Sequence, residues 1–204
     1  MVATRPIPDR RKLAGTTMIE VLVTIVILSI GLLGLAGAQS RLQLSEMESY
    51  QRTQALILLN DMASRISTNR HAAPDYLSDA TTPWVGAGMS CPTVTSSSTR
   101  QQIDSAHWCN ALQGAAEIEG LDALARRGAV IGGRGCIERI STSNDYLVTV
   151  AWQGLTPISA PPTDVACGAD SAGTNPYNGA AGSPCTNDRC RRVVTTIVRI
   201  ANLN

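Results

Sequence analysis

Phenylalanine is absent from the 204 residues, lysine occurs once, at Lys12, and histidine occurs twice, at His71 and His107. Charged residues make up 16% of the chain, well below the roughly 25% of a typical soluble domain. The net charge of +1 is too balanced for the basic surface of a nucleic-acid-binding domain. Neither histidine has the spacing of a catalytic triad or a metal site, and no G-x-S-x-G or phosphate-binding loop occurs. We therefore expect a protein that is not an enzyme, with no cofactor or metal, no small-molecule substrate and no nucleic-acid partner.

Six cysteines are present, all beyond residue 90 of the chain: Cys91, Cys109, Cys136, Cys167, Cys185 and Cys190. An even number in a loop-rich region favours an oxidising compartment and up to three disulfides. Only Cys185-x4-Cys190 and His107-x-Cys109 approach the spacing of zinc ligands, and neither pattern recurs. We expect one pair within 167–190 and one that joins Cys91 or Cys109 to its surroundings, with the full connectivity left open.

Residues 21–40 form an uncharged and largely apolar run of twenty residues. As a helix, this run would be about 30 Å long, which matches the hydrocarbon core of a bilayer. The basic residues before it, among them Arg10, Arg11 and Lys12, would keep the N-terminus in the cytoplasm. The remainder of the chain would then lie outside, where the cysteines can oxidise.

Two common explanations of this run leave one residue without a role. A secretory signal peptide is possible because Ala36-Gly37-Ala38 offers a cleavage site, although the run exceeds the usual length of about 7–15 residues. A plain signal anchor explains the length and the flanking charges. Neither explains why Glu20 stands at the head of a membrane helix, where a carboxylate is costly and usually functional.

The junction before the run resembles the class III signal of type IV pilins and related pseudopilins. A basic leader ends at Gly15, and Glu20 follows five residues later within Met18-Ile19-Glu20-Val21-Leu22. The resemblance implies that prepilin peptidase removes residues 1–15 by cutting between Gly15 and Thr16, and that Thr16 is then methylated. The chain departs from the family at Thr16, where phenylalanine is usual. The resemblance also implies that Glu20 pairs with the N-terminal amine of a neighbouring subunit and sets axial register; the alternative is a side chain that only reaches toward water.

The patterns downstream predict an α+β fold of the type IV pilin kind, in which a long N-terminal α-helix packs on a small antiparallel β-sheet. We expect the helix from about 16 to 69, with 16–40 as the membrane or filament-core part, 41–73 as an amphipathic continuation, and 74–204 as a globular head. The continuation is expected to present an apolar face formed by Leu44, Met47, Ala55, Leu58, Met62 and Ile66. Within the head the patterns predict a loop over 74–98, a helical region over 99–127, strands over 136–140, 146–152 and 191–200, and a cysteine-stapled loop over 153–190.

Three charged or polar residues of the head also have an expected position. Arg191 and Arg192 are expected to lie at a solvated strand end, with binding of an acidic partner as the less favoured alternative. His107, beside Trp108, is expected to pack where a helix meets the sheet.

The whole chain is similar to minor pilins of the type IV pilus, most closely over the leader, the helix and residues 55–66, 135–137, 146–154 and 191–194. This resemblance implies a single-pass inner-membrane protein with its head in the periplasm, which enters the pilus and reaches the cell exterior after assembly. Its implied partners are prepilin peptidase, other minor pilins, the major pilin and an adhesin-like protein at the pilus tip, and its implied role is to prime assembly for twitching motility and adhesion. The alternatives are a pseudopilin of type II secretion and, less favoured, a soluble periplasmic binding domain released after a Sec signal.

Overall fold

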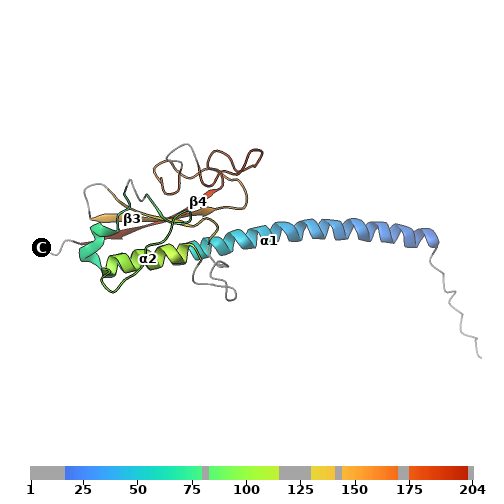
Figure 1. The fold of residues 1–204 in the computed structure, drawn as a ribbon. Coiled ribbons are helices and arrows are strands. Elements are labelled where there is room, and N and C mark those ends of the chain that lie inside the picture. Colours follow the sequence, from blue (N-terminus) through green and yellow to red (C-terminus); the bar gives the residue numbers. More distant parts are fainter. Residues whose placement is uncertain (1–16, 80–82, 115–129, 141–143, 170–174, 202–204) are drawn as a thin grey trace, which may run out of the picture. The chain divides into compact units, whose positions relative to one another are not determined.

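The computed structural model describes residues 17–79, 83–114, 130–140, 144–169 and 175–201. Contacts between Cα atoms divide the chain into two compact units, with the boundary between Gln43 and Leu44. Helix α1 (Met18–Thr68) contributes to both units, and the sheet and helix α2 belong to the second (Figure 1).

The 51-residue helix α1 confirms the prediction of one long N-terminal helix. In the second unit, the face of α1 that packs inward presents five buried residues, spaced by three or four positions: Gln51, Ala55, Leu59, Met62 and Ile66. Leu58 packs against the same core while partly exposed. The predicted apolar face is wrong at Leu44 and Met47, which stay about half exposed, because the buried stripe begins only at Gln51.

A short 3-10 helix, η1 (Arg70–Tyr76), follows α1 and contains Pro74. The chain then runs along strand β2, where the Ser78 N–H donates to the Ile137 carbonyl at 2.8 Å. The predicted loop over 74–98 is therefore incomplete, because it also holds the two-residue strand β1 (Val85–Gly86). Pairing with Gly135 and Arg134 holds β1 in place, and a contact so distant along the chain leaves no local sequence pattern.

The sheet is an antiparallel meander in the order β1-β2-β3-β4. Strand β2 spans Arg134–Arg139, β3 spans Asp145–Gln153 and β4 spans Arg191–Arg199, so the three predicted strands are confirmed to within two residues at each end. The register places Thr149 of β3 between Cys136 of β2 and Thr195 of β4. Residues 141–143 of the predicted hairpin turn lie outside the described residues.

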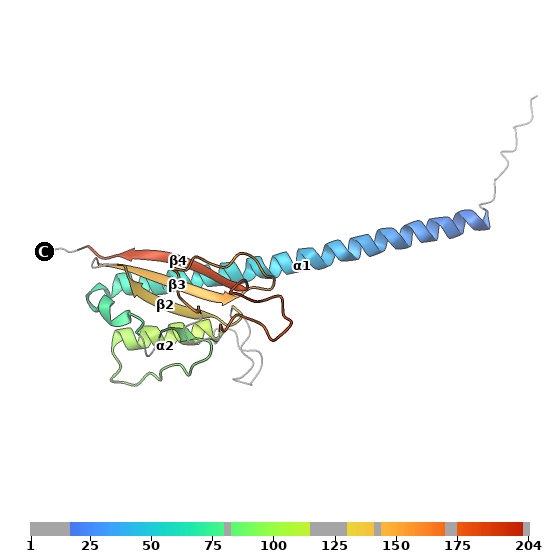
Figure 2. The same ribbon diagram turned by 90° about the horizontal axis from the view of Figure 1, so that it is seen from above.

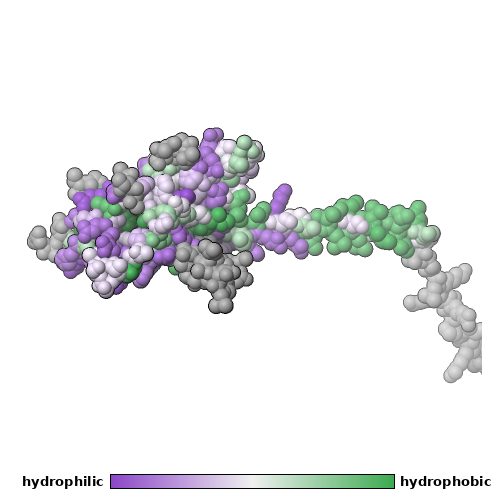
Figure 3. Space-filling model, viewed as in Figure 1, coloured by the Kyte–Doolittle hydropathy of each residue, from purple (hydrophilic) through white to green (hydrophobic). Residues whose placement is uncertain are grey.

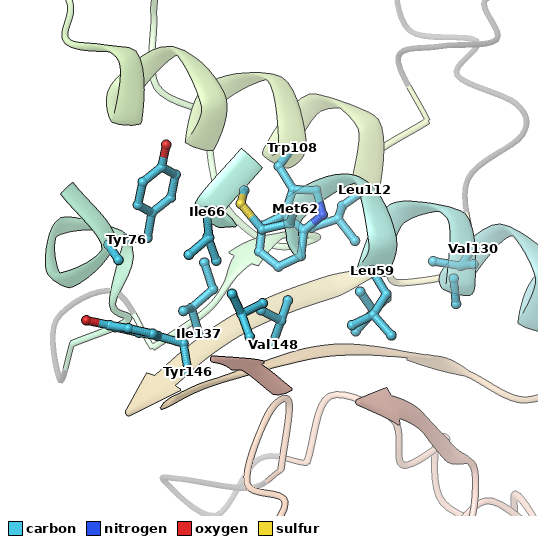
Figure 4. Close-up of a cluster of buried hydrophobic side chains, with 14 of the residues drawn as sticks. Leu59, Met62, Ile66, Tyr76, Trp108, Leu112, Val130, Ile137, Tyr146 and Val148 are labelled. Carbon is cyan, nitrogen blue, oxygen red and sulfur yellow. The ribbon is translucent and has the colours of Figure 1, made fainter. Parts of the chain in front are cut away.

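Helix α2 (Arg100–Leu112) and the second part of α1 pack on one face of this sheet and form the main core (Figures 2 and 4). Thr99 caps α2, with Gln102 completing a reciprocal capping box. Trp108 lies at the centre of the contact, since its indole N–H donates to the Leu58 carbonyl at 2.9 Å. Its ring covers Gly135 so closely that a Cβ there would overlap it. The predicted helical region over 99–127 is confirmed for α2, and residues 115–129 lie outside the described part of the chain.

The opposite face of the sheet is covered by the irregular segment that connects β3 to β4. Tyr177 packs there with Ala151 and the disulfide of Cys136 and Cys167, and its hydroxyl donates to the Gly132 carbonyl at 2.9 Å. The guanidinium of Arg134 stacks between the rings of Trp84 and Tyr177, 5.5 Å and 5.0 Å from their centroids. These contacts hold the described parts of this segment, which contain no helix or strand, against the sheet.

Three disulfides join the six cysteines: Cys91–Cys109, Cys136–Cys167 and Cys185–Cys190. The first ties the segment before α2 to that helix, the second ties the connecting segment to β2, and the third closes a short loop directly before β4. The C-terminal loop is therefore stapled, as the sequence predicts.

Removal of the Cys136–Cys167 disulfide by a double serine substitution should cost about 4 kcal/mol of unfolding free energy. The matched loss of Cys185–Cys190 should cost about 2 kcal/mol, because the two bonds close loops over sequence separations of 31 and 5 residues. Urea unfolding of the full chain in detergent, followed by tryptophan fluorescence, measures both. Equal losses would contradict the loop-length argument.

Candidate functional site

The N-terminal turn of α1 positions Glu20. The Glu20 N–H donates to the Thr17 carbonyl at 3.0 Å and contacts the Thr17 hydroxyl at 3.4 Å, so Thr17 lies directly before the first turn and accepts from it. A carboxylate in the first turn is favourable beside the helix dipole. No described residue forms an ion pair with Glu20, and its side chain is exposed. Gly15 and Thr16 lie outside the described residues.

The apolar residues that follow Glu20 are not covered by the rest of the described chain. Every large apolar side chain from Met18 to Leu35 is at least 46% exposed, and Figure 3 shows this part of α1 as an almost continuous apolar surface. By length and composition, α1 is the one described helix that qualifies as a membrane span. An apolar surface of this size requires a nonaqueous environment.

Residues 10–36 match the family model of the prokaryotic N-terminal methylation motif. The chain carries the processing signal of pilin-like proteins. The match includes Gly15, Thr16 and Glu20, and prepilin peptidase is the enzyme that a signal of this kind addresses. The apolar part of α1 has the length and composition of the membrane anchor that such a protein has before assembly. No curated protein and no solved structure matches the chain.

In the second compact unit, Arg192 joins helix α1 to the start of strand β4. Its guanidinium donates to the Glu48 carboxylate at 2.6 Å, to the Thr156 carbonyl at 2.6 Å and to the Arg189 carbonyl at 3.1 Å. The second oxygen of Glu48 accepts from the Leu155 N–H at 3.3 Å. One ion pair therefore holds α1, β4 and the segment after β3 together.

The neighbouring Arg191 is 2% exposed and fixes the connecting segment. It pairs with Asp188 at 2.6 Å and donates to the carbonyls of Val165 and Cys167 at 2.8 Å and 3.0 Å. The expectation of a solvated strand end at Arg191 and Arg192 is therefore wrong. Both guanidinium groups are buried because they bind main-chain carbonyls that no strand or helix satisfies.

His107 is also placed wrongly by the sequence, because its side chain is exposed on α2. The adjacent Trp108, 1% exposed, occupies the contact with α1 and the sheet. Successive residues of a helix point in different directions, and here Trp108 and Cys109, not His107, lie on the buried side of α2. The described residues contain no group of three or more His, Cys, Asp or Glu side chains that could hold a metal ion.

Asp104 is a buried carboxylate that the sequence did not single out. It accepts from the Tyr76 hydroxyl at 2.7 Å and pairs with Arg65 at 2.8 Å and Arg100 at 3.2 Å. Burial alone would raise its pKa, but the hydrogen bonds from Tyr76 and Arg65 and the nearby positive charges outweigh burial and hold the pKa below its ordinary value. Burial also raises the pKa of Tyr76 to about 12, and the Asp104 carboxylate adds to that shift.

Asp104 lies beneath an open cleft of about 360 Å³ lined by Asp61, Ser64, Arg65, Thr68, Asn69 and Arg100. Ligand pockets are usually enclosed and mostly apolar, whereas this cleft is polar and its charges are paired internally. The cluster therefore fastens α1, η1 and α2 to one another.

The substitution Asp104→Asn should lower the unfolding free energy at pH 7 by about 3 kcal/mol, because it leaves the Arg65 charge without its buried partner. Since folding lowers the pKa of Asp104, its carboxylate stabilises the fold above the ordinary pKa of about 4, and this contribution is lost as the pH falls through the lowered value. The variant should therefore lose less stability than the wild type below about pH 4.

Asp61→Asn is the matched control, since Asp61 pairs with the same Arg65 at 2.9 Å but its side chain is 41% exposed. Its loss should cost below about 1 kcal/mol. Urea unfolding at pH 3 to 7 measures both variants. Equal costs for the two at pH 7 would show that Asp104 is not the centre of the cluster.

Proposed function

We propose that the chain is a minor pilin of the type IV pilus, which joins other minor pilins and the major pilin to prime pilus assembly. The observation that carries this proposal is the methylation motif at residues 10–36, at the head of a helix that continues without interruption to Thr68. In this role the chain reaches the pilus tip with an adhesin-like partner and supports twitching motility and adhesion.

The finer assignment is to the minor pilin PilV, the type IV pilus modification protein, which the chain resembles in sequence. The resembling stretches lie at the head's main contacts: 55–66 contains the buried Ala55, Leu59, Met62 and Ile66, and 191–194 contains the two buried arginines. The stretch 135–137 contains Gly135, which lies under the ring of Trp108. A likeness at such positions supports a common way of packing the head on α1.

Topology in the membrane follows from the same segment. Before processing, the chain is a single-pass protein of the inner membrane with a cytoplasmic N-terminus and a periplasmic head. The periplasm is oxidising, which agrees with three disulfides in the head. After assembly the apolar part of α1 leaves the bilayer for the core of the filament, and the head becomes extracellular.

A periplasmic domain released at Ala38 is less compatible with α1, because that cut would fall inside a continuous helix. A pseudopilin of type II secretion shares the motif and the fold. Loss of surface pili in a deletion strain that still secretes its exoproteins supports the pilus assignment, and the reverse result supports the secretion system.

Glu20 is proposed to set the axial register of the assembled subunits. A carboxylate and an amine that are both removed from water cost several kcal/mol each when alone and become tolerable as a pair. The amine of the neighbouring subunit's first residue, created by cleavage before Thr16, is the proposed partner. This pairing explains why an acidic residue is kept at the head of an apolar helix.

Substitution Gly15→Val should block processing, because a side chain at the cleavage site prevents close approach of the peptidase. The uncleaved precursor should accumulate in the inner membrane, whereas the wild-type chain should begin at Thr16. Gly37→Ala is the control, since a Cβ at Gly37 would meet nothing within 4 Å. N-terminal sequencing and the mass of the purified chain measure the result, and normal processing of Gly15→Val would refute a class III signal.

Substitution Glu20→Ala should leave insertion and cleavage intact but lower incorporation into pili by about tenfold or more. Glu20→Gln should fail as well, because it keeps the shape and removes the charge. Glu46→Ala is the control, since Glu46 is an exposed carboxylate of the same helix outside the apolar segment. Immunoblots of sheared pili and of membranes measure incorporation, and normal incorporation of Glu20→Gln would contradict the ion pair.

A further inference from the structure

Strand β4 forms one lateral edge of the sheet (Figure 2). The N–H of Gly154 donates to the Cys190 carbonyl, and the N–H of Ile200 donates to the Asn144 carbonyl. Since hydrogen-bonded pairs alternate along an antiparallel ladder, the even-numbered residues of β4 bond to β3. The main-chain groups of Val193, Thr195, Ile197 and Arg199 therefore face outward, and no described residue pairs with them.

The outer edge of β4 has the features of a strand that can pair with a further strand. It runs for nine residues, each opposite one residue of β3, so no bulge interrupts it, and it contains neither proline nor lysine. Its sequence is rich in valine, threonine and isoleucine, which favour extended pairing. Thr195, Ile197 and Arg199 are exposed on it.

The other edge of the same sheet is protected. Only two residues of β1 pair with β2. The next residue of β2 whose main-chain groups face away from β3 is Ile137, and Ser78 bonds to both its N–H and its carbonyl. Natural proteins shorten or cover sheet edges to prevent unwanted strand pairing. The difference between the two edges indicates that β4 is left open for a partner.

Charge argues against a second copy of this chain as that partner. Two β4 strands paired antiparallel about Thr195 would set Arg199 of each copy opposite the other copy's Arg191, which already pairs with Asp188. Since β4 contains no carboxylate, a second copy would leave Arg199 without an opposite charge across the pair. The exposed Arg199 instead favours an acidic residue opposite it. The chemistry of the edge selects an extended segment with β-branched residues and a carboxylate at its N-terminal end.

We propose that an extended acidic-ended segment of a different protein adds to β4 as a fifth, antiparallel strand. This inference rests on the proposed function only in taking that protein to be another pilus subunit. Main-chain hydrogen bonds would supply the affinity, and the side chains around Ile197 and Arg199 would supply the selectivity. Incorporation of the chain into a pilus would then require two interactions. Helix α1 would contact its neighbours in the filament core, and the partner's segment would add to strand β4 of the head.

The test uses the mature full chain in detergent and a synthetic eight-residue peptide of alternating threonine and valine, with glutamate as its second residue. Binding should slow amide hydrogen exchange at Val193, Thr195, Ile197 and Arg199 by about tenfold or more, while amides that already bond to β3 change less. Replacing the peptide's glutamate with lysine should weaken binding about two- to fivefold or more. A central proline in the peptide should abolish binding.

Two variants of the chain examine the same edge. Thr195→Pro removes an outward N–H and should abolish binding, whereas the control Thr195→Val keeps that N–H and should bind normally. Arg199→Glu changes an exposed side chain and should invert the preference between the glutamate and lysine peptides, which keeps the test valid if Thr195→Pro unfolds. Absence of exchange protection, or protection without the alternation, would overturn the proposal. A dimer of the chain alone, detected by analytical ultracentrifugation and lost in Thr195→Pro, would also overturn it, since the occupant would be a second copy.

Outcomes in cells separate this inference from the proposed function. If Glu20→Ala abolishes incorporation into pili while the peptide leaves the β4 amides unprotected, strand addition is wrong and the pilin role stands. If the peptide binds as expected and the chain is never found with pilus subunits, the pilin role is wrong and the edge remains a strand-binding site for another partner.

Discussion

The head cannot form its core without helix α1. Ala55, Leu59, Met62 and Ile66 fill the space between α2 and the sheet, each no more than 2% exposed. A sheet of four strands and a single further helix would leave the apolar face of β3 open to water, which a domain of this size cannot tolerate. The helix that begins in the apolar segment is thus also the central element of the soluble fold, so anchoring and folding depend on one continuous stretch of chain.

Buried charged side chains hold the irregular main chain of the head in place, as hydrogen bonds within helices and strands do elsewhere in the fold. Arg191 and Arg192 bind four main-chain carbonyls and two carboxylates around the start of β4, and Asp104 fastens the ends of α1, η1 and α2. Each such group is costly when its partner is removed. The disulfides act in the same regions, and together these bonds explain how a long segment between β3 and β4 with little helix or strand keeps a defined path.

Much of the fold could be predicted because its signals are local. The uncharged run predicts the first part of α1, and β-branched stretches predict β2, β3 and β4. Other features depend on contacts between distant residues. Arg192 is buried because Glu48 lies opposite it, 144 residues earlier, and β1 exists because it meets β2. The pairing of Cys136 with Cys167 follows from the sheet placing Cys136 under the connecting segment, which spacing does not reveal. Gly15 and Glu20, by contrast, are recognisable from a short motif that needs no tertiary contact.

All three disulfides join residues beyond position 90, so none crosses from α1 to the sheet. Apart from the main chain itself, α1 is therefore held to the sheet by noncovalent contacts: the Arg192–Glu48 ion pair, the Trp108 hydrogen bond and the apolar packing between them. Loops closed by a disulfide keep their length when the fold is pulled, so a force that separates α1 from the sheet would act first on these noncovalent contacts.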